Sequence, residues 1–360
     1  LFRSLSEDVA RFYGYDRIPS VLPHPQTGDR SGLTFLQRRR RDISLSLAQR
    51  GFTEVQNYPF TNEKELKVFG FTGDRAKTFR IANPMSDELP LLRTHLTPGL
   101  LTTAARNLAR GEKSVALFES GLVFRNLEKL ESVGAVSTAR KPTSAQIKRI
   151  YSSVPTQALH LGGVIAGDFE RSGWWGAARK SDWSDAVSLA TRLLREIGVE
   201  FTVQNVELAP WHPGRCAEFR IDGRAVAHAG EIHPRIITSM NLPQRTSAFV
   251  IVLDAIPFAP VVTATPVNTL PAAIQDISLF VPATTPAGEV AAALAEGAGE
   301  LLEKIELFDR FQKPGEGLVS LAFTLTFRAP DRTLTSDEVS QLRQRAGERA
   351  VARVGATIRR

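Results

Sequence analysis

The alternation of apolar and polar positions predicts a strand, a turn, a helix and a second strand in one stretch of the first half of the chain. The first strand is TFRIA at 78–82, and Asn83–Pro84 ends it because proline disfavours helical geometry for the residue before it. Thr97 as N-cap and Pro98 at the first helical position then begin the helix. The second strand, 114–124, is expected at the centre of an antiparallel sheet.

Similar patterns place further elements on both sides of that stretch. Helices are expected at residues 1–14, 33–50 and 181–198, and strands at residues 52–60, 159–167 and 247–256. A hairpin is expected to turn at Asp222–Gly223, a dipeptide favoured in two-residue turns. Residues 125–157 lose periodicity and carry six basic against two acidic side chains, which indicates a mobile insertion. Trp174 and Trp175 are expected to pack in the core rather than to stack on bases.

The last part of the chain has its own order of elements. Residues 272–360 read as strand, helix, strand, strand, helix and a short final strand at 356–359, which is typical of a ferredoxin-like α+β sandwich. Thr335 and Glu338 form a T-x-x-E capping box at the start of the final helix. The predicted domains are 1–25, the tail of a preceding small domain with a linker; 26–265, a core; and 266–360, the ferredoxin-fold domain.

Composition limits the functional classes. Of 360 residues, 42% are hydrophobic and 23% are charged, as in proteins that bury a sizeable core. No apolar run approaches the roughly 18 residues that span a bilayer, so no membrane span is expected. The single cysteine, Cys216, excludes an internal disulfide framework and fits a reducing cytoplasm. The net charge of +7 favours an acidic partner such as nucleic acid.

Basic residues gather in two places. Arg38–Arg41 form a run that spans more than one helix face, so most of these arginines are expected in solvent. Residues 271–309 hold one basic and seven acidic side chains, whereas residues 310–360 hold ten basic and five acidic ones, which predicts one basic face toward a phosphate backbone. The candidate phosphate-binding side chains are Arg310, Lys313, Arg328, Arg332, Arg345, Arg349, Arg353 and Arg359. Three of them recur at four-residue spacing on the final helix and form one stripe. Phe308 and Phe311 are candidates for base stacking, with at least one expected in the core.

A metal-dependent hydrolase is the enzymatic alternative. Its candidate ligands are His212, His228, Glu231 and His233. Residues 228 and 231 face opposite ways on a strand, and prolines after two of the histidines fit turn ends better than a rigid ligand platform. The sequence also lacks a G-x-x-x-x-G-K-[ST] phosphate loop, a G-x-S-x-G elbow and a C-x-x-C pair. The pattern therefore favours binding over metal catalysis.

Several motifs carry a resemblance to a known family. They are NPMSDELPLLRTHLTPGLL, LFESGLVF, LGGVIAG at 161–167, HPGR at 212–215, GEIHP at 230–234, LFDRF at 307–311, SLAFTLTF at 320–327 and RTLTSDEV at 332–339. In this order they resemble the carboxy-terminal half of the bacterial phenylalanyl-tRNA synthetase beta subunit.

The resemblance implies an α+β chain with a class II synthetase-like antiparallel sheet as an inactive, catalytic-like core and a ferredoxin-fold anticodon-binding domain. In that family the intact enzyme is an alpha2-beta2 tetramer, and the alpha subunit uses ATP and magnesium to join phenylalanine to tRNA(Phe). The beta portion scaffolds the alpha subunit in the cytoplasm, and the basic side chains above become tRNA-binding residues. A glycine-rich G-x-G-x-G strand for ATP is absent from the sequence, so this chain alone is expected to be inactive, with no catalytic residues.

At some positions the sequence departs from the family pattern, so the resemblance implies that some of the family's sites are incomplete in this chain. Glu7 and Asp8 fall on two positions of a magnesium site in the family, but Ser4 stands where the family has an aspartate. Gln275 stands where the family usually has an arginine. The family's editing site lies before Leu1, so no editing is expected of this chain. A freestanding RNA-binding paralogue that needs no alpha subunit is the remaining alternative, and co-purification with an alpha subunit separates the two.

Overall fold

A computed structural model describes residues 2–21, 32–125, 133–258, 267–312 and 317–359, together with residues 127, 130, 264 and 315. The chain divides into two compact units, Leu1–Val262 and Thr263–Arg360. Two apolar clusters form the core of the first unit and a third forms the core of the second. Among the described residues no helix has the length and apolar character needed to cross a membrane.

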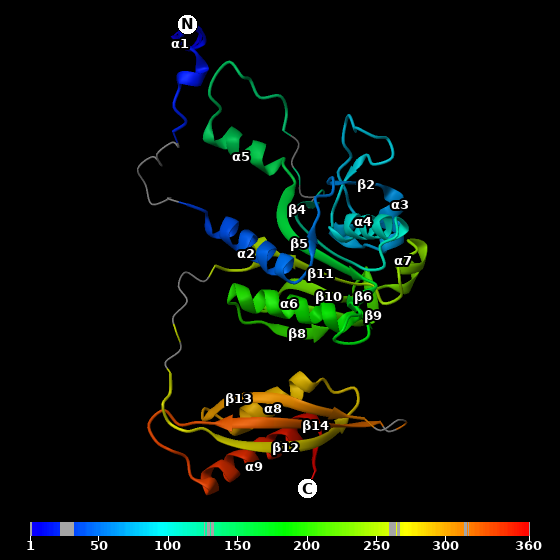
Figure 1. The fold of residues 1–360 in the computed structure, drawn as a ribbon, viewed down its shortest axis with the longest axis vertical. Helices are drawn as coiled ribbons and strands as arrows, with labels where there is room; N and C mark the ends of the chain where they lie inside the picture. Colours follow the sequence, from blue (N-terminus) through cyan, green and yellow to red (C-terminus); the bar gives the residue numbers. More distant parts are fainter. Residues whose placement is uncertain are drawn as a thin grey trace. The chain divides into compact units, whose positions relative to one another are not determined.

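A seven-stranded sheet in the order β1-β4-β5-β11-β10-β9-β8 forms the middle of the first unit (Figure 1). Its strands are β1 (Thr53–Glu54), β4 (Val115–Arg125), β5 (Thr156–Ala166), β8 (Thr202–Asn205), β9 (Trp211–Ile221), β10 (Arg224–Ile232) and β11 (Ser247–Val252). Neighbouring strands are antiparallel, except that β1 runs parallel to β4. The expected strand 114–124 therefore exists as β4, but it lies next to the edge, and β11 is the central strand.

Helices cover both faces of this sheet because successive side chains of each strand point to opposite faces. On one face lie α3 (Glu63–Phe69), α4 (Thr97–Ala109) and α7 (Pro234–Ser239); on the other lie α2 (Phe35–Gln49) and α6 (Trp183–Ile197). Leu117 of β4 packs in the first cluster and Phe118 in the second. Leu100 of α4 and Leu47 of α2 are fully buried, and each contributes on the order of 1.5–3 kcal/mol.

Local signals set the ends of these helices. Thr34 and Gln37 form a capping box at the start of α2. Asp182 caps α6, and Gly198, with φ of 80°, ends it in the left-handed region that glycine tolerates. The expected hairpin turn is present between β9 and β10, where Asp222 and Gly223 both have positive φ, of 48° and 73°.

Smaller elements complete the first unit. They are α1 (Phe2–Tyr13), α5 (Ser144–Ser152), the 3-10 turns η1 (Tyr15–Arg17), η2 (Gly73–Arg75) and η4 (Leu253–Ala255), and the two-stranded pairs β2 (Phe60–Thr61) with β3 (Leu91–Leu92) and β6 (Asp168–Glu170) with β7 (Arg179–Lys180). The helix α5 lies in the segment predicted to lack periodic structure. A capping box of Thr143 and Gln146 begins it, and this T-x-x-Q signal is visible in the sequence.

Three local predictions are wrong. Thr97 is the first residue of α4, not its N-cap; Leu96 holds that position, so Pro98 is second. The segment 78–82 makes only an isolated bridge between Arg80 and Leu91. The segment 52–60 is not one strand, because its two ends pair in different sheets as β1 and β2.

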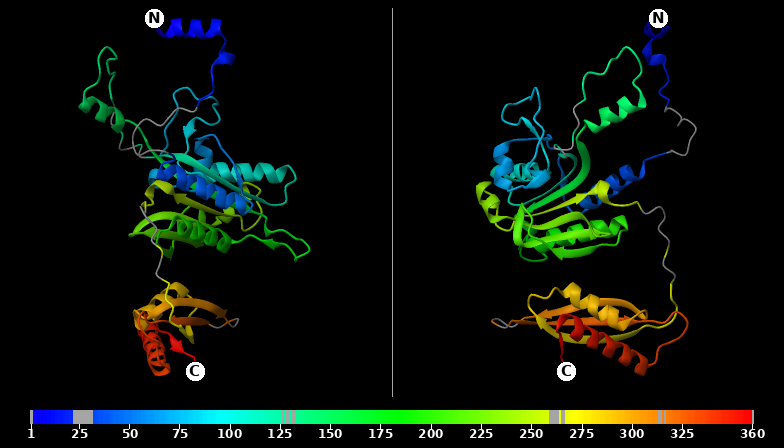
Figure 2. Two further views of the ribbon diagram at one scale, coloured as in Figure 1. Left: turned by 60° about the vertical axis from the view of Figure 1, so that its left-hand side comes forward. Right: turned by 180° about the vertical axis from the view of Figure 1, so that it is seen from behind.

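The second unit has the predicted order of elements. Its sheet, in the order β13-β14-β12-β15, consists of β12 (Ala273–Pro282), β13 (Leu302–Phe311), β14 (Leu318–Phe327) and β15 (Thr357–Ile358), and its helices are α8 (Ala287–Ala298) and α9 (Ser336–Val354) (Figures 1 and 2). Ile277, Leu279 and Val281 alternate along β12 into the cluster that both helices share. The predicted capping box of Thr335 and Glu338 begins α9.

Candidate functional site

The candidate phosphate-binding residues are spread over the second unit, and several have acidic partners within it. Arg349 and Arg353 of α9 both form ion pairs with Glu296 of α8; the Arg353 contact is 3.0 Å. Hydrogen bonding to Glu296 raises the pKa of Arg349, and the same contact lowers the pKa of Glu296. The basic stripe predicted on α9 is therefore partly neutralised by an acidic residue of α8.

Two further candidates serve the fold of the second unit. Arg328 binds Glu303 at 2.8 Å and donates to the carbonyl oxygen of Leu270. Arg332 forms a two-pronged contact with Glu338, with distances of 2.7 and 3.0 Å. That contact lowers the pKa of Glu338 to about 2. Both arginines therefore hold loops and a helix cap as well as carrying charge.

Three further candidates, Arg310, Arg345 and Arg359, have no acidic partner among the described residues. Within the described part of the chain, the side chain of Arg345 makes no hydrogen bond or ion pair, and the side chain of Arg310 donates one hydrogen bond, to the amide oxygen of Gln312 at 3.1 Å. The Arg359 guanidinium lies 5.9 Å from the ring centroid of Phe280. Lys313 lies outside the described residues.

Aromatic side chains lie on the face of this sheet that α8 and α9 do not cover. In the strand register Ser320 of β14 stands opposite Phe280 of β12 and Phe311 of β13, so the three side chains point to one face. Phe311 is 61% exposed and Phe308 is 57% exposed. The expectation that one of these two lies in the core is wrong, because a bulge in β13 breaks the alternation between them.

The two candidate magnesium ligands do not make a site by themselves. Glu7 and Asp8 are adjacent residues of α1, and Asp8 is held by Arg11 at 2.5 Å. No group of three or more His, Cys, Asp or Glu side chains suited to a metal occurs in the part of the chain that the structure describes. These residues alone therefore do not fit a magnesium ion.

Three of the four candidate hydrolase residues have separate partners, whereas the buried Nδ1 of His212 has no hydrogen-bond partner among the described residues. His228 contacts Glu218 at 3.0 Å and stacks on Trp211, and burial lowers its pKa. Glu231 is bound by Arg215 at 2.8 Å. The Nδ1 atom of His233 accepts a hydrogen bond from the backbone N–H of Arg235, so His233 caps the start of α7. The side chains of His228, Glu231 and His233 are thus used by the fold, which argues against a shared metal.

A buried polar network lies on the α4 side of the sheet. Two of its members, Arg93 and Glu119, belong to the motifs quoted above, but the motifs did not indicate that these residues pair. Arg93 and Glu119 form an ion pair at 2.5 Å, with side chains 9% and 3% exposed. Asn57 donates to Glu119 at 2.7 Å and accepts from Thr103 at 2.6 Å, and Arg93 also donates to the carbonyl oxygen of Leu122. Each polar group is already satisfied, so the network holds the fold and offers no free group for chemistry.

Two buried histidines lie near that network. Burial lowers the pKa of His160 to about 3, with a smaller effect of Arg125, and it lowers the pKa of His95 well below the ordinary value. Arg125 is anchored by a hydrogen bond to the carbonyl oxygen of Thr94 at 3.1 Å. Both histidines are therefore neutral near pH 7.

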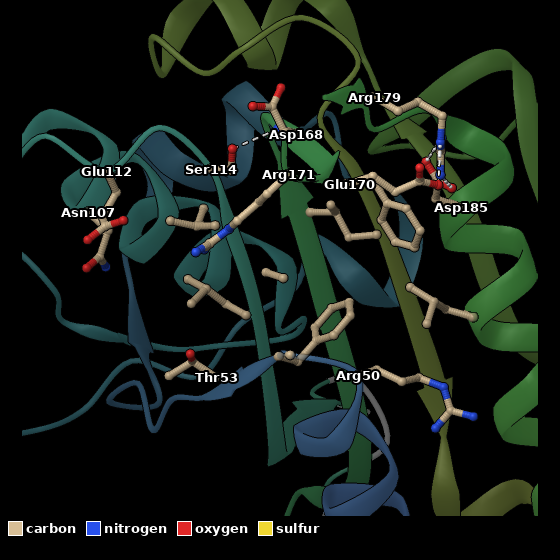
Figure 3. Close-up of a pocket in the computed structure, with 18 of the residues that line it drawn as sticks. Arg50, Thr53, Asn107, Glu112, Ser114, Asp168, Glu170, Arg171, Arg179 and Asp185 are labelled. Carbon is tan, nitrogen blue, oxygen red and sulfur yellow. Dashed lines mark hydrogen bonds and ion pairs between the residues drawn. The ribbon is translucent and has the colours of Figure 1, made fainter. Parts of the chain in front are cut away.

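A pocket lies where α2, β1, the ends of β4 and β5, the β6–β7 hairpin and α6 meet (Figure 3). Its volume is about 1060 Å³. Apolar side chains line it, among them Phe52, Ile165 and Leu189. Arg179 is bound to Asp185 on one wall, whereas the long side chain of Arg171 projects into the pocket.

The structure corrects the prediction for the tryptophans beside this pocket. Trp174 is 94% exposed and Trp175 is 66% exposed, so neither packs in the core. The sequence signal for this was available: Gly173 and Gly176 flank the pair and are typical of a loop tip.

Comparison with known proteins gives two matches that together cover most of the chain. Residues 18–253 match the phenylalanyl tRNA synthetase beta chain CLM domain, and residues 268–359 match the ferredoxin-fold anticodon binding domain. The phenylalanine-tRNA ligase beta subunit of Streptomyces avermitilis is 44% identical over 99% of this chain and 44% of its own length. The subunits of Thermobifida fusca and Corynebacterium efficiens are 43% and 39% identical, over 99% of this chain and 44% and 43% of their own lengths. The chain thus spans under half the length of these relatives.

Among solved structures, a pyrrolysyl tRNA synthetase, PylSc of Desulfitobacterium hafniense, is 15% identical with a TM-score of 0.42, over 61% of this chain and 64% of that chain.

Proposed function

Because this chain belongs to the phenylalanyl-tRNA synthetase beta-chain family, we propose that it is a noncatalytic portion of such a subunit, which scaffolds a catalytic alpha subunit and binds tRNA(Phe). In this proposal two alpha and two beta chains form a tetramer in the cytoplasm, and the alpha subunit consumes ATP with magnesium. The first unit is a class II synthetase-like sheet without catalytic residues, and the second unit contacts the anticodon stem.

One observation carries the scaffold role: Arg93, an arginine buried on the sheet face under α4, is already paired with Glu119. The Arg93–Glu119 pair is enclosed, and His160 is neutral because of its burial. A site for ATP needs cationic donors that are free to meet phosphates. The absence of a glycine-rich G-x-G-x-G strand from the sequence supports the same conclusion.

The test is retention of the chain on an immobilised alpha subunit, with phenylalanine-dependent ATP–pyrophosphate exchange measured in parallel. We expect retention, and we expect exchange by the chain alone to equal a buffer blank. Exchange by the purified chain alone would refute the noncatalytic assignment. Binding to tRNA without retention on the alpha subunit would favour the freestanding RNA-binding paralogue.

For tRNA binding we propose that phosphate contacts dominate and that arginines without acidic partners contribute most. Arg345 and Arg359 belong to this group, whereas Arg349 and Arg353 are bound to Glu296. Phe311, exposed on the uncovered sheet face, is available to stack on an unpaired base.

The measurement is a tRNA titration of the whole chain over a range of salt concentrations. Arg345→Ala and Arg359→Ala should each lower the log–log salt slope by somewhat under about one unit, because each removes one phosphate contact. Arg349→Ala is the matched control on the same helix and should change the slope less. Equal effects of Arg345→Ala and Arg349→Ala would contradict the role given to Glu296, and salt-independent binding would contradict phosphate contact.

A further inference from the structure

The β6–β7 hairpin presents two tryptophans that the core does not bury. Trp174 is 94% exposed and Trp175 is 66% exposed, and the hairpin loop stands out from the body of the first unit (Figure 2, left). A tryptophan buries on the order of 150–250 Å² when it packs. Leaving two such rings in water forfeits that stabilisation, and paired exposed aromatics therefore mark an interaction surface.

The loop holds these rings in place before any partner arrives. Gly173 and Gly176 exchange two backbone hydrogen bonds, of 3.0 and 3.1 Å. The indole N–H of Trp175 donates to the carbonyl oxygen of Arg171 at 3.2 Å, and the rings of Trp174 and Trp175 meet edge to face, 5.8 Å apart. The Trp175 ring lies over Gly173, where an added Cβ would be 2.6 Å from it. A partner therefore meets a preorganised pair and loses little conformational entropy in binding it.

The pocket beside the hairpin extends this surface. Residues at the base of the hairpin, from Asp168 to Arg171, form part of its wall, and Arg171 projects into it (Figure 3). Of the charged lining residues, Arg171, Arg192 and Glu112 are those whose side chains have no partner within the described ranges. The unpaired charge is thus net positive, which suits a partner that brings a carboxylate.

The charges of the hairpin favour a protein over a nucleic acid. Two of its three cations are already engaged, Arg179 by Glu170 and Asp185, and Lys180 by Asp168. A surface for nucleic acid needs several unpaired cations to displace counterions. Protein interfaces instead use tryptophan and arginine anchors with few unpaired charges, which is the composition found here.

We propose that Trp174, Trp175 and the adjoining pocket form the docking surface for the catalytic alpha subunit, which places an apolar segment over the rings and a carboxylate against Arg171. This inference rests on the proposed function and names the surface that the scaffold uses. The two tryptophans act as the apolar anchors. The pocket beside them accepts the part of the alpha subunit next to the segment that covers the rings.

The experiment compares the affinity of the full chain for an immobilised alpha subunit across variants. Trp174→Ala with Trp175→Ala should weaken binding by about 30-fold or more, as expected for a central anchor pair. Both rings are exposed, so the melting temperature should not change. Tyr151→Ala is the matched control, because Tyr151 is an exposed aromatic of the same unit, 74% accessible, on the separate helix α5.

A second set of variants tests whether the alpha subunit places a carboxylate against Arg171. Arg171→Glu should weaken binding more than Arg171→Ala, and Arg171→Lys should restore most of it, since charge reversal repels an acidic partner. If the wild-type chain binds the alpha subunit and the double tryptophan variant binds equally well, the docking surface is refuted while the proposed function stands. If the wild-type chain does not bind, both are refuted. Loss of tRNA affinity in the double variant, with alpha binding intact, would make the surface RNA-facing and overturn the inference.

Discussion

At the scale of single residues, contacts rather than residue type decide what each charged side chain does. Arg93 and Glu119 are buried and paired, and a Cβ added at Gly121 would overlap the Arg93 guanidinium, so a larger residue there would displace that side chain. Arg39 donates to the carbonyl oxygens of Leu253, Ile256 and Pro257. Its neighbour Arg38 has the same chemistry but lies exposed to solvent. Buried polar groups persist only when they are satisfied, which is why these contacts are specific.

His160 leads to a prediction about pH at this scale. Its pKa is lowered to about 3 in the folded protein, mainly by burial, against roughly 6.5 in an unfolded chain. Below about pH 6.5 the unfolded state therefore binds more protons than the folded state. This contribution to stability is complete above that pH and is lost progressively as the pH falls toward 3, by about 1.4 kcal/mol per pH unit for one such histidine.

Urea denaturation at pH 7, 6 and 5 measures this effect and stays above the range in which most carboxylates titrate. His95 adds to the slope because its pKa is also lowered by burial. His160→Gln should flatten the dependence of the unfolding free energy on pH, whatever its effect on stability at pH 7. An unchanged slope in that variant would show that His160 is protonated, or accessible, in the folded state.

At the scale of elements, glycines in one helix show how closely two helices pack. A Cβ added at Gly297 of α8 would lie 2.5 Å from the carbonyl oxygen of Arg345 and 2.8 Å from the Cα of Ala346 in α9. Gly288 lies in the same helix, and a Cβ there would meet nothing within 4 Å. The two glycines thus have opposite environments in one element. The close approach at Gly297 brings Glu296 within reach of Arg349.

These glycines give a paired prediction. Gly297→Ala should destabilise the protein by about 1–3 kcal/mol, because the added methyl group forces the backbones of α8 and α9 apart. Gly288→Ala should instead stabilise it by about 0.4–1 kcal/mol, because alanine reduces the freedom of the unfolded chain. Chemical denaturation followed by circular dichroism measures both. The same sign for both substitutions would contradict the close packing of the two helices.

At the scale of the whole molecule, net charge is a weaker guide than the pairing of charges. The formal charge of +7 suggests a broadly basic surface. Within the second unit, however, acidic residues of α8, β13 and α9 hold Arg328, Arg332, Arg349 and Arg353. The basic and acidic halves seen in the sequence therefore meet each other, and only part of the positive charge stays available for a partner.

The sequence by itself determined the features that depend on neighbouring residues. The order of elements in the second unit, the capping box at Thr335, the end of α6 at Gly198 and the turn at Asp222 all follow from local signals. Family membership was also readable, because the motifs keep their order across the chain and the comparisons confirm it. The capping box of α5, formed by Thr143 and Gln146, is a local signal of the same kind.

Only the tertiary structure decided the features that join distant residues. The place of β4 beside the edge, the ion pairs on Glu296 and the exposure of Trp174 depend on which segments fold together. Helical spacing and strand alternation indicate which side of a helix or strand is apolar, but they do not indicate which other element packs against that side. Burial and pairing are set by contacts between residues far apart in the chain. Those contacts determine whether an arginine is bound to an acidic residue of the same chain or is left without a partner.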